Sequence, residues 1–102
     1  MKDISYKEFF STLATGSRLD ILQFLKQNGT RNVSEIALGT GQEQSAVSHN
    51  LKKLLACECV HVETDGKTRN YSLNNQTIEP LLNLVDKHIE QYCQSECQHC
   101  SG

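Results

Sequence analysis

The sequence lacks the features that would indicate several domains or a membrane-spanning segment. Its 102 residues include a single proline, and they contain no low-complexity stretch and no evident repeat. We therefore expect no linker and one domain over residues 1–102. No apolar run approaches the length of a membrane span or resembles a signal peptide, which predicts a cytoplasmic protein with no membrane partner.

The groupings typical of enzymes are also missing, and so is a strong charge of either sign. No Ser/His/Asp set, phosphate-binding loop or pair of acid–base carboxylates stands out, so we do not expect an enzyme. The formal net charge is −2, which argues against a non-specific polyanion binder but leaves room for a local basic face. A hydrophobic content of 37% supports only a small core, which pairing with a second copy would help to stabilise.

Cysteines, in contrast, are concentrated at the end of the sequence. The chain has five of them, an odd number that fits poorly with a closed disulfide framework. Cys93, Cys97 and Cys100 fall with His99 within the last ten residues. If the preceding helix runs on, the three sulfurs share one helical face. Because thiolates and imidazoles bind soft and borderline metal ions, this cluster is a candidate metal site. The alternative is a frayed tail with incidental cysteines.

Apolar periodicity predicts four helices, a hairpin and a final helix. The first helix spans Ile4 to Leu13, Ser17 caps the second, Asn28-Gly29 stops it, and Asn32 with Glu35 forms a capping box at the third. After a turn at Gly39-Thr40-Gly41, a fourth helix places Val47, Leu51, Leu54 and Leu55 inward. Residues 60–64 and 68–73 alternate as two strands around Asp65-Gly66, and the last helix runs from about Thr77 to the cysteines.

This order of elements is a winged helix-turn-helix pattern, mainly α with a β-hairpin wing. In such a fold the fourth helix fits the major groove of DNA, while the hairpin reaches phosphates or the minor groove. Between residues 42 and 71, however, four basic side chains are balanced by four acidic ones. We therefore expect the fold to sort the basic residues to one face.

Several strings resemble the ArsR/SmtB family of repressors. The most specific are Ser-x-Val-Ser-His at residues 45–49 and Gly-x-x-Arg-x-Tyr-x-Leu at residues 66–73. The resemblance implies a homodimeric repressor of operator DNA, with its first and last helices at the dimer interface and a metal ion or metalloid as the trigger of release. The DNA contacts that it implies are Gln44, Ser45, Ser48, His49 and Lys52 on the helix, and Lys67 and Arg69 on the wing.

Differences from the usual ligand residues of the family limit which residues can form the sensing site. Val33-Ser34-Glu35 stands where arsenic sensors often carry a Cys-Val-Cys pair. The positions that bind zinc in other members fall at Asn75, Thr77, His88 and Gln91, so that zinc site is absent. The C-terminal cysteines remain, and they are similar to the terminal thiol sites of some arsenite-responsive members.

The predicted inducer is As(III), which favours three sulfur ligands, at Cys93, Cys97 and Cys100. Zn²⁺ with His99 as fourth ligand, Cd²⁺, or a redox disulfide within the cluster are the alternatives. A protein-interaction module without DNA affinity also remains open. Cys59 is expected to pack as a small hydrophobe, and so is Cys57, although cadmium- and lead-sensing relatives use a thiol near that junction. Glu58 replaces the family's usual glycine there.

Overall fold

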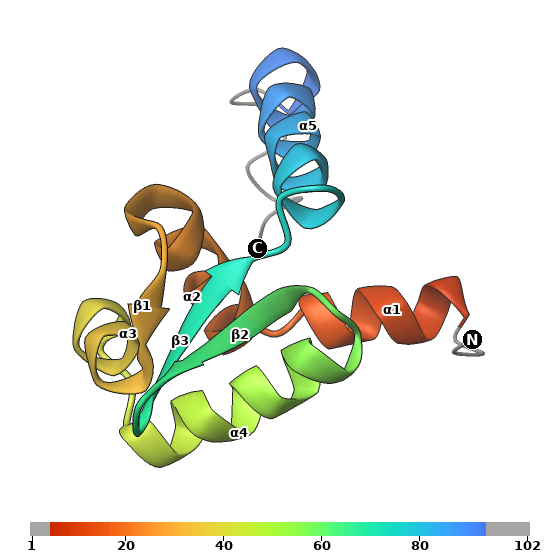
Figure 1. Ribbon diagram of the computed structural model, residues 1–102. Helices are drawn as coiled ribbons and strands as arrows, with labels where there is room; N and C mark the ends of the chain where they lie inside the picture. The colour runs from red at the N-terminus through yellow and green to blue at the C-terminus, as the bar shows by residue number, and fades with distance from the viewer. Residues whose placement is uncertain (1–4, 94–102) are drawn as a thin grey trace.

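The computed structural model describes residues 5–93 and confirms the predicted winged helix-turn-helix (Figure 1). Five helices and a three-stranded sheet form along the chain. They are α1 (Tyr6–Leu13), α2 (Gly16–Asn28), β1 (Arg31–Asn32), α3 (Val33–Thr40), α4 (Gln44–Ala56), β2 (Val60–Asp65), β3 (Thr68–Leu73) and α5 (Ile78–Tyr92).

Capping side chains mark the starts of α1, α2 and α3, with one correction to the sequence analysis. Asn32 and Glu35 form the expected capping box at α3, and a second box joins Ser5 to Glu8 at α1. The cap of α2, however, is Thr15, whose hydroxyl accepts from the backbone N–H of Arg18 at 3.4 Å. Ser17 lies inside the helix instead, where its hydroxyl is free to bond to another helix.

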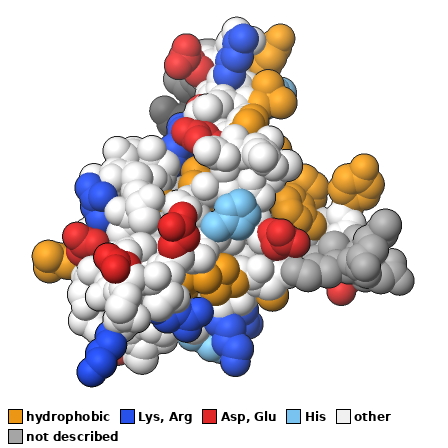
Figure 2. Space-filling view, viewed as in Figure 1, with side chains coloured by type: hydrophobic (Ala, Val, Ile, Leu, Met, Phe, Trp, Pro, Cys, Tyr) orange, Lys and Arg blue, Asp and Glu red, His pale blue; other side chains and the backbone are white. Residues whose placement is uncertain are grey.

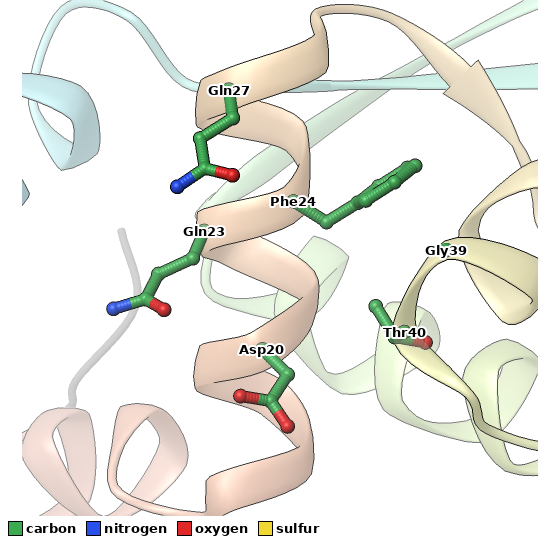
Figure 3. Close-up of a pocket in the computed structure, with 6 residues that line it drawn as sticks. All are labelled: Asp20, Gln23, Phe24, Gln27, Gly39 and Thr40. Carbon is green, nitrogen blue, oxygen red and sulfur yellow. The ribbon is translucent and has the colours of Figure 1, made fainter.

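The end of α3 also differs slightly from expectation. Gly39 and Thr40 belong to the helix, and only Gly41, at φ 71°, turns the chain into the left-handed region. Gly39 is needed for a different reason: the ring of Phe24 on α2 occupies the space that a Cβ would fill (Figure 3). The glycine thus lets α2 and α3 approach closely.

The sheet has the order β1-β3-β2, and all its pairings are antiparallel. β2 and β3 are the predicted wing, joined by the two residues Gly66 and Lys67, with Gly66 at φ 65°. β1 was not predicted. It has only two residues, Arg31 and Asn32, which pair with Tyr71 and Asn70, and so short a strand has no readable alternation.

The core lies between the helices and the inner face of the wing. Its fully buried side chains come from α2, α3, α4, β2 and the residue before β2: Ile21, Leu22, Ile36, Val47, Leu51, Leu54, Cys59 and Val60. Burial of such side chains is the main favourable contribution to folding, at about 1.5–3 kcal/mol each. The core therefore holds α4 and the wing in a fixed relation.

α5 projects away from this body, and α1 extends to another side (Figure 1). Ile78 is the buried residue of α5, and Lys26 of α2 forms an ion pair of 2.8 Å with Asp86 farther along it. Both α1 and α5 expose large apolar side chains: Tyr6, Phe10, Leu84, Val85, Ile89 and Tyr92. Among residues 5–93, no helix is long and apolar enough to cross a membrane.

Candidate functional site

The outer face of α4 carries all five side chains that the sequence analysis assigned to DNA on this helix. Val47, Leu51 and Leu54 are fully buried along the inner face of the helix. The helical period therefore turns the intervening polar positions outward. The exposed residues of α4 include Gln44, Ser45, Ser48, His49 and Lys52. These side chains carry hydroxyl, amide, imidazole and ammonium groups, which can bond to base edges and phosphates.

A buried amide, which the sequence analysis did not single out, fixes α4 against the body. Asn50 is only 8% exposed. Its Oδ1 accepts from Arg18 Nε at 3.2 Å, and its Nδ2 donates to the Ser17 hydroxyl at 3.2 Å. Arg18 also donates to the carbonyl of Thr12 at 2.9 Å. The signal in the sequence was an asparagine on the apolar face of an amphipathic helix. Because a buried polar group is stable only when it is bonded, this network fixes the position of α4.

The wing sorts its charges in the way that a DNA-binding surface needs. Val62 pairs with Tyr71, and Thr64 pairs with Arg69. Because side chains alternate across a sheet, Arg69 lies on the same face as the buried Tyr71, toward α4. Glu63 and Asp65 occupy the intervening positions and point to the opposite face. On the wing, the fold thereby separates Arg69 from Glu63 and Asp65.

A cleft of about 460 Å³ opens between α4 and this inner face of the wing. Its lining consists of Val33, Ser48, Lys52, Leu55, Arg69 and Tyr71. The Arg69 guanidinium lies 5.8 Å from the centre of the Tyr71 ring, a cation–π distance. Neither Lys52 nor Arg69 forms an ion pair with a carboxylate of residues 5–93. Two cations and a hydroxyl with no acidic group in the lining suit an anionic group such as a phosphate.

The space-filling view agrees with this distribution. Lys and Arg side chains gather along its lower edge, over α4 and the tip of the wing (Figure 2). Most Asp and Glu side chains visible on that face lie higher. Lys67 belongs to the two-residue loop at the tip of the wing, where it is exposed. The Lys and Arg side chains over α4 and the tip of the wing therefore lie on one side of the molecule.

The candidate thiol site is described only at its first residue. Cys93 is exposed and follows the last residue of α5, with φ −100° and ψ 75°, so it has left the helical conformation. Cys97, His99 and Cys100 lie outside the described residues. Within residues 5–93, no group of three or more His, Cys, Asp and Glu side chains could hold a metal ion. The arrangement of the three thiols stays a prediction.

The two cysteines after α4 pack against the body. Cys59 is fully buried in the core, which confirms its expected role. Cys57 is half-buried, packs against the core, and lies with its Sγ 3.8 Å from the hydroxyl of Thr12. This packing agrees with the role expected for Cys57.

The residue between these cysteines explains the family's preference for glycine at this position. Glu58 has φ 54°, and it is the non-glycine residue in the left-handed region within the described chain. Its N–H donates to the Leu55 carbonyl at 2.9 Å, and the N–H of Cys59 donates to the Leu54 carbonyl at 2.9 Å. This pair of bonds is the Schellman ending of a helix, which normally places glycine at the left-handed residue.

Comparison with known proteins places the chain among bacterial regulators. Residues 15–62 match the family model described as "Bacterial regulatory protein, arsR family". Over 76% of its length the chain is 34% identical to the arsenical resistance operon repressor of Bacillus subtilis, and the match covers 73% of that protein. It is 41% identical over 78 residues to the HTH-type transcriptional regulator NmtR of Mycobacterium tuberculosis, and the match spans 64% of that regulator's length.

Solved structures give the same result. The crystal structure of M. tuberculosis Rv0081 has a TM-score of 0.76 and 32% identity, over 83% of this chain and 85% of that one. The solution structure of the homodimeric winged helix-turn-helix domain of Mb0332 from Mycobacterium bovis has a TM-score of 0.75 and 27% identity, over 92% of this chain and 94% of that one. The protein therefore belongs to the arsR family of DNA-binding transcriptional regulators.

Proposed function

We propose that this protein is a homodimeric, cytoplasmic repressor that leaves its operator when As(III) binds Cys93, Cys97 and Cys100. The observation that carries the DNA-binding part is the sorting of charge on the wing and α4. Lys52 and Arg69 line one cleft with Ser48, while Glu63 and Asp65 occupy the opposite face of the wing. A major groove has the width for α4, and the flanking phosphates are the anions that this cleft suits.

In this proposal the two groups of side chains have different tasks. Gln44, Ser45, Ser48 and His49 lie on the outer face of α4 and read base edges. Lys52, Lys67 and Arg69 contact phosphates, which sets the register of the protein on the duplex and makes binding depend on salt.

The homodimer is supported by the exposed apolar side chains of α1 and α5. Six large apolar side chains on these helices are 43–86% exposed, an arrangement that marks an interaction surface. The related M. bovis domain is homodimeric, and pairing through α1 and α5 would cover the apolar side chains of both helices. A dimer also supplies two copies of α4, as needed for two half-sites about one helical turn apart.

The choice of As(III) rests on ligand chemistry and on one relative. Three thiols within eight positions can supply three sulfur ligands, and the B. subtilis relative is named for arsenical resistance. Zn²⁺ and Cd²⁺ are the competing inducers, since thiolates bind both.

A competitive titration tests the proposal. The reduced protein is bound to the DNA upstream of its own gene, followed by fluorescence anisotropy, and then titrated with As(III), Cd²⁺ or Zn²⁺. We expect specific binding and release at the lowest concentration by As(III). Release by Zn²⁺ or Cd²⁺ alone would contradict the assigned inducer, and binding no stronger than to random DNA would contradict the repressor.

A further inference from the structure

Asn74 connects the segment after α4 to the start of α5 through both its backbone and its side chain. This residue lies between the wing and the last helix, directly after Leu73 ends β3. Its Nδ2 donates to the carbonyl of Glu58 at 2.8 Å, and its backbone N–H donates to the carbonyl of Cys59 at 3.0 Å. Asn74 thus holds the segment that ends α4.

The same residue also begins α5. The carbonyl of Asn74 accepts from the N–H groups of Ile78 at 3.1 Å and Glu79 at 3.0 Å, and its Oδ1 accepts from the N–H of Gln76 at 3.0 Å. These bonds satisfy N–H groups at the start of the helix that have no partner within it. Thr77, which precedes α5, makes no side-chain capping bond. Asn74 therefore bonds to the segment after α4 and to the start of α5 at once.

The carbonyl that Asn74 holds belongs to the strained residue. Glu58 adopts φ 54°, a conformation that an L-residue keeps only when its surroundings enforce it. The Schellman bonds hold Glu58 from the side of α4, and the amide of Asn74 holds it from the side of α5. A displacement of α5 at Asn74 would therefore act directly on the last turn of α4.

Within residues 5–93, α5 packs on the body through its first turns. Within α5 the buried residue is Ile78, while Leu81 and Leu82 are partly buried against the core. The ion pair between Lys26 and Asp86 is exposed, with side-chain exposures of 25% and 58%, and such pairs contribute little. Among the described residues, the bond between Asn74 and Glu58 is a directional link between the segment after α4 and the start of α5.

We propose that Asn74 is the positioning residue that couples α5 to the DNA-contacting helix α4. When operator DNA binds α4, a shift of the Glu58 carbonyl passes through its hydrogen bond with Asn74 to the first turn of α5. By reciprocity, a ligand that binds at the end of α5 changes the affinity of α4 for DNA. The second half of this statement rests on the proposed function, because it needs an inducer at the end of α5. The first half needs only DNA binding.

The test uses three variants of the full chain. Asn74→Asp removes the Nδ2 donor and keeps the acceptor for Gln76, and Asn74→Ala removes both the side-chain donor and the side-chain acceptor without adding charge. Asn75→Asp is the matched control: it makes the same chemical change one position away, at an exposed residue for which the structure shows no side-chain hydrogen bond. Two measurements are made on each variant and on the wild type.

The first measurement needs no inducer. Amide hydrogen exchange at Ile78 and Glu79 is followed by NMR with and without operator DNA. We expect operator binding to change exchange at these amides in the wild type and in Asn75→Asp, and to leave it unchanged in both Asn74 variants. An equal change in all four proteins, or no change in the wild type, would overturn the coupling role of Asn74.

The second measurement is the ratio of operator Kd values with and without As(III). We expect the ratio to fall about 2- to 30-fold in the Asn74 variants, as for other residues that carry coupling. The affinity for As(III), read from thiolate–arsenic absorption, should stay the same. A ratio preserved in both Asn74 variants would overturn the proposal. A wild-type ratio of one would instead overturn As(III) as inducer, while the exchange measurement still decides on Asn74.

Discussion

At the scale of single residues, the backbone after α4 holds the least expected feature. Glutamate stands where the chain turns left-handed, at φ 54°, although a Schellman ending normally has glycine there. A Cβ in this region meets the following carbonyl oxygen, at a cost of about 1–2 kcal/mol. The position was identifiable in the sequence as a departure from the family, but the reason for the glycine became visible only in the backbone.

Glu58→Gly should therefore stabilise the protein. We expect the free energy of unfolding to rise by about 1 kcal/mol, because the strain removed exceeds the entropy that glycine adds to the unfolded chain. Chemical denaturation monitored by circular dichroism measures the change. Glu58→Ala is the control, since it removes the carboxylate and retains the Cβ. Equal effects of the two substitutions would show that charge, not backbone strain, is responsible.

Gly39→Ala should have the opposite effect. The new methyl group would meet the ring of Phe24, and displacing that ring from between α2 and α3 should cost about 1–3 kcal/mol. Gly16→Ala is the control, because Gly16 begins α2 and no atom lies within 4 Å of its added Cβ. Thermal unfolding of both variants measures the difference. A Gly39→Ala protein as stable as Gly16→Ala would show that Phe24 moves aside freely.

At the scale of elements, periodicity predicted what it can detect. The apolar stripes indicated the long helices α2, α4 and α5. Asp65-Gly66 placed the turn of the wing one residue too early, because Asp65 ends β2 and Gly66 with Lys67 forms the turn. β1 could not be predicted, because its two residues are too few to alternate. Thr15 rather than Ser17 caps α2, and the choice between these nearby hydroxyls depends on backbone geometry that the sequence does not give. The separation of charge on the wing could not be predicted from the sequence alone. Residues 63 and 65 lie on the opposite face of the wing from residue 69 because of the register between β2 and β3.

We propose that α4 reads base edges while the wing contacts phosphates, so substitutions in the two elements should affect DNA binding differently. Ser48→Ala combined with His49→Ala should reduce discrimination between operator and random DNA, because each side chain that reads a base edge well provides about 1–3 kcal/mol of discrimination. Arg69→Ala should weaken binding to both DNAs and lower the slope of log K against log salt by about one unit, as expected when one phosphate is no longer neutralised. Salt-dependent binding isotherms distinguish the two. Full discrimination by the double variant would remove Ser48 and His49 from the reading surface.

At the scale of the whole molecule, the structure leaves α1 and α5 with apolar side chains exposed. Ile89 is 49% exposed on α5, and Tyr6 is 86% exposed on α1. The sequence predicted the α5 stripe from its period. Its exposure was implied only by the resemblance to the family, because the period alone would equally fit a helix packed within one subunit. The orientation of α5 away from the body favours a partner (Figure 1).

Ile89→Glu should weaken dimerisation while leaving the subunit folded. A carboxylate in an apolar interface loses its hydration without gaining a partner, and the residue is exposed in the single chain. Asn83→Glu, at an exposed polar position of α5, is the control and should remain dimeric. Sedimentation velocity at micromolar concentration measures the association, and operator affinity should fall with it. A wild type that sediments as a monomer would contradict the assigned interface.

The proposed release mechanism is tested most directly by one titration. Operator-bound wild type and the triple variant Cys93→Ser, Cys97→Ser, Cys100→Ser are titrated with As(III) under reducing conditions. Because the inducer must bind the DNA-free form more tightly to cause release, we predict that the wild type leaves the operator. The triple variant should bind DNA equally well and stay bound. If the triple variant is released at the same As(III) concentrations as the wild type, the C-terminal cysteines are not the sensor.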